Sequence, residues 1–85
     1  MKTSETGTMT TRDVAENIAQ RAREEDLRAR VWHGDICSRV YLERELSRGW
    51  QRIGYIHIAR DGAVVKAHLT RERAGIARAL GITDY

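Results

Sequence analysis

Apolar residues recur at every fourth position from Val14 onward, which is one stripe of an amphipathic helix. Thr10 precedes this stripe and Asp13 follows three residues later, which is a weaker form of the capping box. We therefore predict a helix that begins at Thr10 or at the residue after it and ends between Arg23 and Asp26.

The pattern then changes to alternation, which is typical of strands with one buried face. A first strand begins at Leu27 and ends before a turn at 33–35, and a second strand follows over 36–43, with Ile36 on its inner side. We expect a polar connection over 44–49 and a third strand over 50–59.

Asp61-Gly62 stands between two alternating apolar segments and predicts a type I′ hairpin, because both central residues of that turn need a positive φ. This turn pairs Ile58 with Val65 and puts all the aliphatic residues on one face. A one-residue slip would destroy that separation. Ile53 fits the pattern only if a bulge near Gly54 turns it inward.

The last helix is marked at both ends. Thr70 is the expected N-cap, Ile76 and Leu80 lie on its apolar face, and Gly81 with Ile82 predicts a Schellman ending.

These elements predict an α+β fold in the order α-β-β-β-β-α. The expected architecture is a four-stranded antiparallel sheet with an N-terminal and a C-terminal helix on one face, because sequence-adjacent strands usually pair. We expect residues 1–9 to be a disordered arm and residues 10–85 to form a single domain.

The second face of this sheet would be left uncovered, and it carries rings and cations. Trp, Tyr and Arg dominate binding hot spots. The candidate partner-binding residues, taken from the alternation, are Arg28, Arg30, Trp32, Arg39, Tyr41, Tyr55, His57, Lys66 and His68.

The chain carries a net charge of +3, and 13 of its 15 basic residues are arginine. A basic surface suits nucleic acid or an acidic protein partner, although the same charges could simply solvate a small domain. The single cysteine excludes an internal disulfide and suits a reducing, cytoplasmic environment. We expect no membrane segment, because no apolar run approaches about 20 residues.

Candidate catalytic chemistry is sparse. His33 and Cys37 are four residues apart, and His57 and His68 would be diagonal neighbours, but paired zinc-ligand spacings are absent from the sequence. Cys37 has no general base in a fixed relation to it, and the glycines form no phosphate-binding loop. We predict no catalytic site, no metal and no cofactor.

Two binding functions remain open. The uncovered face could bind a protein or nucleoprotein complex, including a second copy of the chain as a homodimer, or it could stack bases and neutralise phosphates as a nucleic-acid-binding domain. The aromatic motif of RNA-recognition domains is missing, and four predicted strands separate the helices that a helix-turn-helix would need together.

The chain loosely resembles small phage and mobile-element proteins, among them the anti-CRISPR proteins. The resemblance rests on Arg-Val-Tyr-Leu at 39–42, Gly-Tyr-Ile at 54–56, Asp-Gly at 61–62 and a brief final helix. It implies a steric inhibitor that occupies a surface of a Cas complex. Many such inhibitors are acidic DNA mimics, whereas this chain is basic, and no functional residue carries over.

Overall fold

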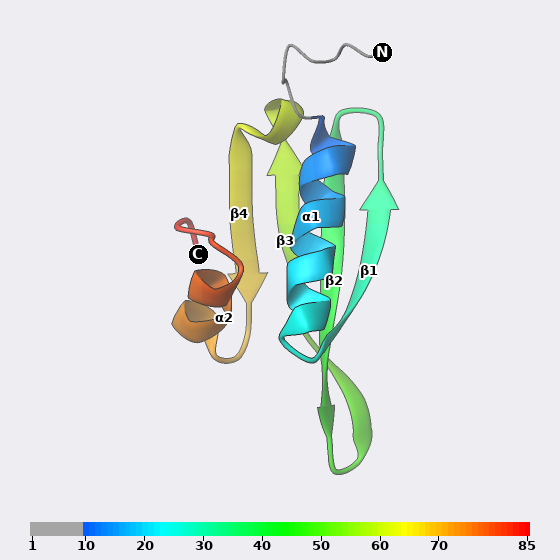
Figure 1. The fold of residues 1–85 in the computed structure, drawn as a ribbon, viewed down its shortest axis with the longest axis vertical. Coiled ribbons are helices and arrows are strands. Elements are labelled where there is room, and N and C mark those ends of the chain that lie inside the picture. Colours follow the sequence, from blue (N-terminus) through cyan, green and yellow to red (C-terminus); the bar gives the residue numbers. More distant parts are fainter. Residues whose placement is uncertain (1–9) are drawn as a thin grey trace.

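The computed structural model describes residues 10–85, so the expected disordered arm over 1–9 lies outside the described residues. The elements in chain order are α1 (Thr11–Glu24), β1 (Leu27–His33), β2 (Cys37–Leu46), β3 (Gly49–Ala59), β4 (Val64–Leu69) and α2 (Arg73–Ala79). The strands form one antiparallel sheet in the order β1-β2-β3-β4 (Figure 1). The predicted α+β class and element order are confirmed.

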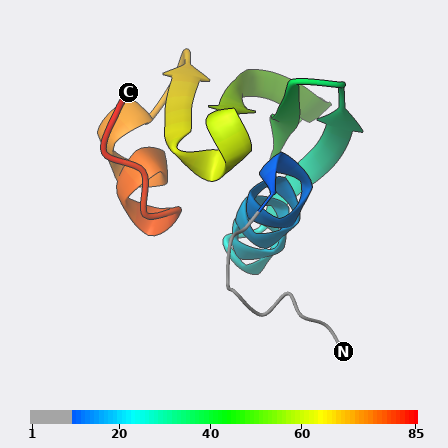
Figure 2. The same ribbon diagram turned by 90° about the horizontal axis from the view of Figure 1, so that it is seen from above.

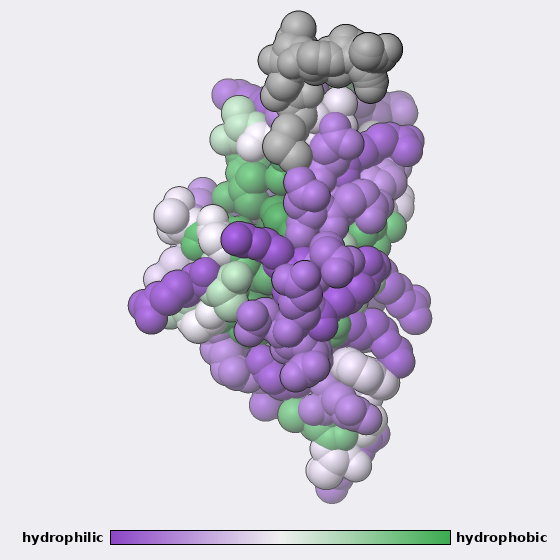
Figure 3. Space-filling model, viewed as in Figure 1, coloured by the Kyte–Doolittle hydropathy of each residue, from purple (hydrophilic) through white to green (hydrophobic). Residues whose placement is uncertain are grey.

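Both helices lie on the same side of the sheet (Figure 2). Helix α1 packs against β1 and β2, and α2 lies beside β4 (Figure 1). The core fills the space between the helices and the sheet, and its largest fully buried apolar side chains are Val40, Leu42, Ile53, Ile56 and Ile58. The surface over α1 is mostly hydrophilic, with an apolar strip beside it (Figure 3).

The first helix starts as predicted. The backbone N–H of Asp13 donates to Thr10 Oγ1 at 3.2 Å, and the N–H of Thr10 donates to Asp13 Oδ2 at 3.3 Å. This reciprocal capping box satisfies two backbone donors that the helix itself leaves unpaired.

No helix of the described residues is long and apolar enough to cross a membrane.

The turn between β1 and β2 differs from the expectation in one residue. The N–H of Gly34 donates to the carbonyl of Cys37 at 2.8 Å, which closes a tight turn over Asp35 and Ile36. Ile36 therefore sits at the tip of the turn and is 84% exposed, so its predicted inward position is wrong.

The expected polar connection over 44–49 is also wrong. β2 continues to Leu46, which pairs with Gly49 across a turn of only Ser47 and Arg48. Gly49 has a φ of 111°, a conformation that glycine adopts without strain. The β2–β3 hairpin consequently extends past the rest of the sheet (Figure 1).

The predicted bulge in β3 is confirmed. Leu42 pairs with Gly54 but Glu43 pairs with Arg52, so Ile53 is the extra residue. Ile53 turns inward and is only 1% exposed.

The hairpin of β3 and β4 keeps the predicted register, with Ile58 opposite Val65. Asp61 and Gly62 both have the expected positive φ, and the N–H of Ala63 donates to the carbonyl of Arg60 at 3.0 Å. Arg60 also has a positive φ, so pairing stops at Ala59 and the loop has four residues, 60–63, rather than two.

Thr70 is not the N-cap of the last helix. Its N–H and its hydroxyl both donate to the carbonyl of Ile53, at 2.8 Å and 3.1 Å. The N-cap is Glu72, and α2 starts at Arg73. The Schellman ending is confirmed, because Gly81 has a φ of 74° and the N–H of Ile82 donates to the carbonyl of Ala77 at 2.8 Å.

The C-terminal residues pair with the outer edge of β4. The carbonyl of Asp84 accepts the N–H of Ala67 at 2.8 Å, and Asp84 forms a parallel bridge with Lys66. This places Tyr85, the last residue, beside the sheet.

Candidate binding face

The register of the sheet gathers eight of the nine predicted partner-binding residues into two rows that cross all four strands. One row is Trp32, Arg39, His57 and Lys66, and the other is Arg30, Tyr41, Tyr55 and His68. Arg28, the ninth, lies one step further along β1, opposite Glu43. We call this set of nine residues the cation–aromatic face.

The cation–aromatic face is the side of the sheet that the helices do not cover. The residues that alternate with it, such as Val40 and Ile56, are fully buried in the core that α1 closes. Trp32 on the opposite side is 51% exposed, and Tyr41 and Tyr55 are half-buried. The predicted division between the two faces therefore holds.

Tyr55 lies at the centre of a stacked cluster. Its ring centroid is 5.8 Å from that of Tyr41 and 4.8 Å from that of His68, and the His68 ring stacks on it with an interplanar angle of 24°. The guanidinium of Arg39 lies 4.9 Å from the Tyr55 ring centroid. These contacts restrict the side chains before any partner arrives, which lowers the entropy cost of binding.

The alternation alone missed two residues that join this face, Trp50 and Arg52. The guanidinium of Arg28 lies 4.4 Å from the Trp50 ring centroid, and that of Arg52 lies 5.4 Å from the ring of Tyr41. The sequence feature that could have identified them is the bulge at Ile53. One extra residue in a strand reverses which of the side chains beyond it point to each face of the sheet.

The charge of this face is mainly positive. Arg28 forms an ion pair with Glu43 at 3.4 Å, whereas the two rows themselves contain Arg30, Arg39 and Lys66 and no carboxylate. The Tyr41 phenol raises the pKa of Arg39, through a side-chain hydrogen bond and a coulombic attraction. Arginine is charged at any physiological pH, so Arg39 carries a positive charge on this face.

A groove of about 710 Å³ opens where this face meets the edge of β4. The groove is lined by four rings, those of Tyr41, Tyr55, His68 and Tyr85. Three cationic side chains from different elements also line it: Arg52 of β3, Lys66 of β4 and Arg73 of α2. None of the described residues that line the groove is acidic.

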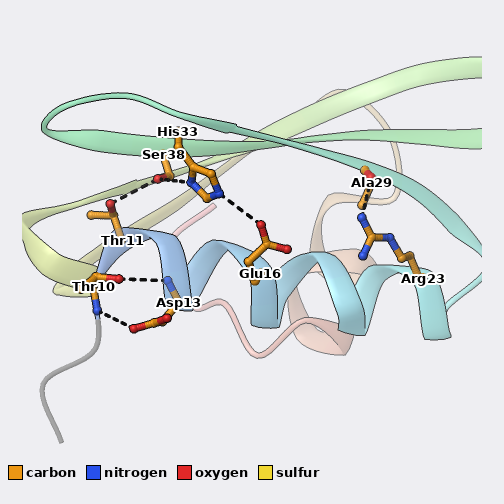
Figure 4. A network of polar contacts seen from close by, with 8 residues as sticks. All are labelled: Thr10, Thr11, Asp13, Glu16, Arg23, Ala29, His33 and Ser38. Carbon is orange, nitrogen blue, oxygen red and sulfur yellow. Dashed lines mark hydrogen bonds and ion pairs between the residues drawn. The ribbon is translucent and has the colours of Figure 1, made fainter. Parts of the chain in front are cut away.

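A serine, a histidine and a carboxylate form a chain of contacts on the helix side (Figure 4). His33 Nδ1 is 3.0 Å from Ser38 Oγ, and His33 Nε2 is 3.1 Å from Glu16 Oε2. The Ser38 hydroxyl also lies 3.2 Å from Thr11 Oγ1. Ser38 is fully buried, so its hydroxyl cannot meet a substrate, and the contacts tie α1 to the β1–β2 hairpin.

The other residues considered for chemistry remain apart. Cys37 is a free, half-buried thiol, and His57 and His68 face different cross-strand partners, Lys66 and Tyr55. Over residues 10–85 there is no group of three or more histidine, cysteine or acidic side chains that could hold a metal ion.

Comparison of the chain with protein-family models, with curated proteins and with solved structures finds no match. The arguments for function therefore rest on the geometry and the charge of the cation–aromatic face.

Proposed function

We propose that this chain is a small, non-catalytic interaction module. It binds a larger protein or nucleoprotein complex through its cation–aromatic face and blocks that complex sterically, as an anti-CRISPR-type inhibitor does. The observation that carries the proposal is the two-row arrangement of rings and cations on the side of the sheet that the helices leave open. A reducing cytoplasm, which the single cysteine suits, is the proposed compartment.

The composition and rigidity of the face support binding. Hot spots of interfaces are rich in Trp, Tyr and Arg, and they lie in preorganised patches. Trp32 offers a half-exposed indole, and the Tyr41 ring is already fixed between Tyr55 and Arg52. A steric mode of action requires only that such a surface be occupied, so it needs no catalytic group.

The proposal is tested by removing one ring at a time. Trp32→Ala and Tyr41→Ala should each weaken capture of the partner from extracts of the native host by about 2 kcal/mol, which is roughly thirtyfold in affinity. Circular dichroism should show an unchanged fold, because Trp32 is half-exposed and Tyr41 is not part of the core cluster. The matched control is Arg12→Gln, which changes an exposed residue of α1 and should capture normally.

Wild-type capture by both ring variants would contradict the proposal. A light-scattering mass of two chains at about 100 μM, lost in Trp32→Ala, would instead show that the face is covered by a second copy of the chain.

A further inference from the structure

We propose that the cation–aromatic face binds single-stranded nucleic acid, with one nucleotide seated in the groove that Tyr85 closes at the β4 edge. This inference rests on the proposed function, since it names the chemistry that the same face contacts in its partner.

The charge of the centre of the face argues for a polyanion. The buried centre of a protein–protein interface is enriched in arginine but depleted of lysine and of acidic residues, whereas interfaces with nucleic acid are polar and strongly positive throughout. Here both central rows carry cations, with Arg39 at the middle of the sheet and Lys66 and Arg30 at its sides. A protein partner would have to desolvate these cations, while a phosphate backbone neutralises them and releases counterions.

The placement of the rings argues for bases rather than for phosphates alone. Tyr85 is 49% exposed and lines the groove, and Trp32 on β1 is 51% exposed. Three inter-strand spacings separate β1 from β4, so these rings lie about 14 Å or more apart, given the usual spacing of about 4.8 Å. A single strand laid across the sheet can stack one base near each ring, which is how sequence-tolerant proteins bind single strands.

The groove has the size of a small-ligand site, which is the size that one nucleotide needs. Its volume of about 710 Å³ lies within the range of small-ligand sites, about 300–1,000 Å³. Aromatic side chains line one part of it, and Arg52, Lys66 and Arg73 supply positive charge at its borders. A base can contact the rings while its phosphate lies near these cations.

The surface favours a single strand over a duplex. In a duplex the bases are stacked on one another, so their faces are closed to Tyr85 and Trp32, whereas a single strand leaves them free. Over residues 10–85 both helices lie on the other side of the sheet, so neither can enter a major groove from the cation–aromatic face (Figure 2).

The test is fluorescence anisotropy of the full chain with a labelled oligothymidylate of about 12 nucleotides. We expect binding at about 50 mM salt and an affinity that falls about tenfold or more on raising the salt to about 200 mM. Arg52→Gln and Lys66→Gln should each weaken binding and flatten the salt dependence. Tyr85→Ala should weaken binding about fivefold or more without flattening it.

Arg12→Gln is the matched control, since it removes an exposed arginine on the helix side and should bind like the wild type. Tyr85 is half-exposed and is absent from the core cluster, so a folding defect in its variant is not expected, and circular dichroism checks this.

Four outcomes overturn the inference. The first three are no binding at about 50 mM salt, equal binding of a DNA duplex of the same length, and equal binding of a polyglutamate peptide of the same length. The fourth outcome is equal binding of the oligonucleotide by the wild type and by all the face variants, because the oligonucleotide then binds outside the cation–aromatic face. The proposed function is judged separately, by whether Trp32→Ala loses the larger partner. If the oligonucleotide does not bind but Trp32→Ala still weakens capture of the larger partner, the proposed function stands, and the partner surface is a protein.

Discussion

Gly54 decides which side chains reach the cation–aromatic face. Its φ of 143° is open to glycine but strained for other residues, and a Cβ there would lie 2.2 Å from the carbonyl oxygen of His68. The bulge formed with Ile53 reverses the alternation, so Arg52 joins the face while Ile53 enters the core.

Replacing this glycine should therefore be costly. We expect Gly54→Ala to lower the free energy of unfolding by about 3 kcal/mol, the sum of backbone strain and a backbone clash, as measured by chemical denaturation. Gly75→Ala is the matched control: this glycine lies in α2 with nothing within 4 Å of its Cβ position, so the change should stabilise the protein by about 0.5–1 kcal/mol. Equal stability of the two variants would show that the bulge has no steric requirement.

At the scale of elements, local sequence signals predicted those ends of helices and strands that local chemistry controls. The capping box of α1, the Schellman ending of α2 and the positive φ values at Asp61 and Gly62 each involve residues within a few positions of one another. One signal failed because a distant partner decided the outcome. Thr70 looks like an N-cap, but the carbonyl of Ile53 takes both of its donors, and the strand partner is not visible in the local pattern.

The cap of α1 gives a direct prediction at this scale. Thr10→Ala should lower the free energy of unfolding by about 1 kcal/mol, because the N–H of Asp13 loses its acceptor. Thr83→Ala, at an exposed position with no capping role, should leave the midpoint of urea unfolding unchanged. A wild-type midpoint for Thr10→Ala would mean that the capping box contributes nothing to stability.

At the scale of the whole molecule, the chain is a two-layer protein with an asymmetric surface. The helices cover one side of the sheet, and the other side carries rings and cations in register. All nine candidate residues could be placed on one face from the sequence, because side chains alternate along a strand and the register of the β3–β4 hairpin was specified by its aliphatic pattern. Trp50 and Arg52 could have been added to this face from the predicted bulge near Gly54, because the bulge reverses the alternation. The position of Tyr85 could not be predicted, since it depends on the pairing of the C-terminal residues with β4.

The central claim is that the cation–aromatic face, and not the helix side, meets the partner. Site-specific photo-cross-linking in the native host tests it most directly, with the cross-linking residue placed at Ala59, which lies on this face two positions from His57, or at the exposed Gln20 on α1. We predict a cross-linked species of higher mass from position 59 and none from position 20. Cross-linking from position 20 alone would contradict the claim, because the partner would then lie over α1.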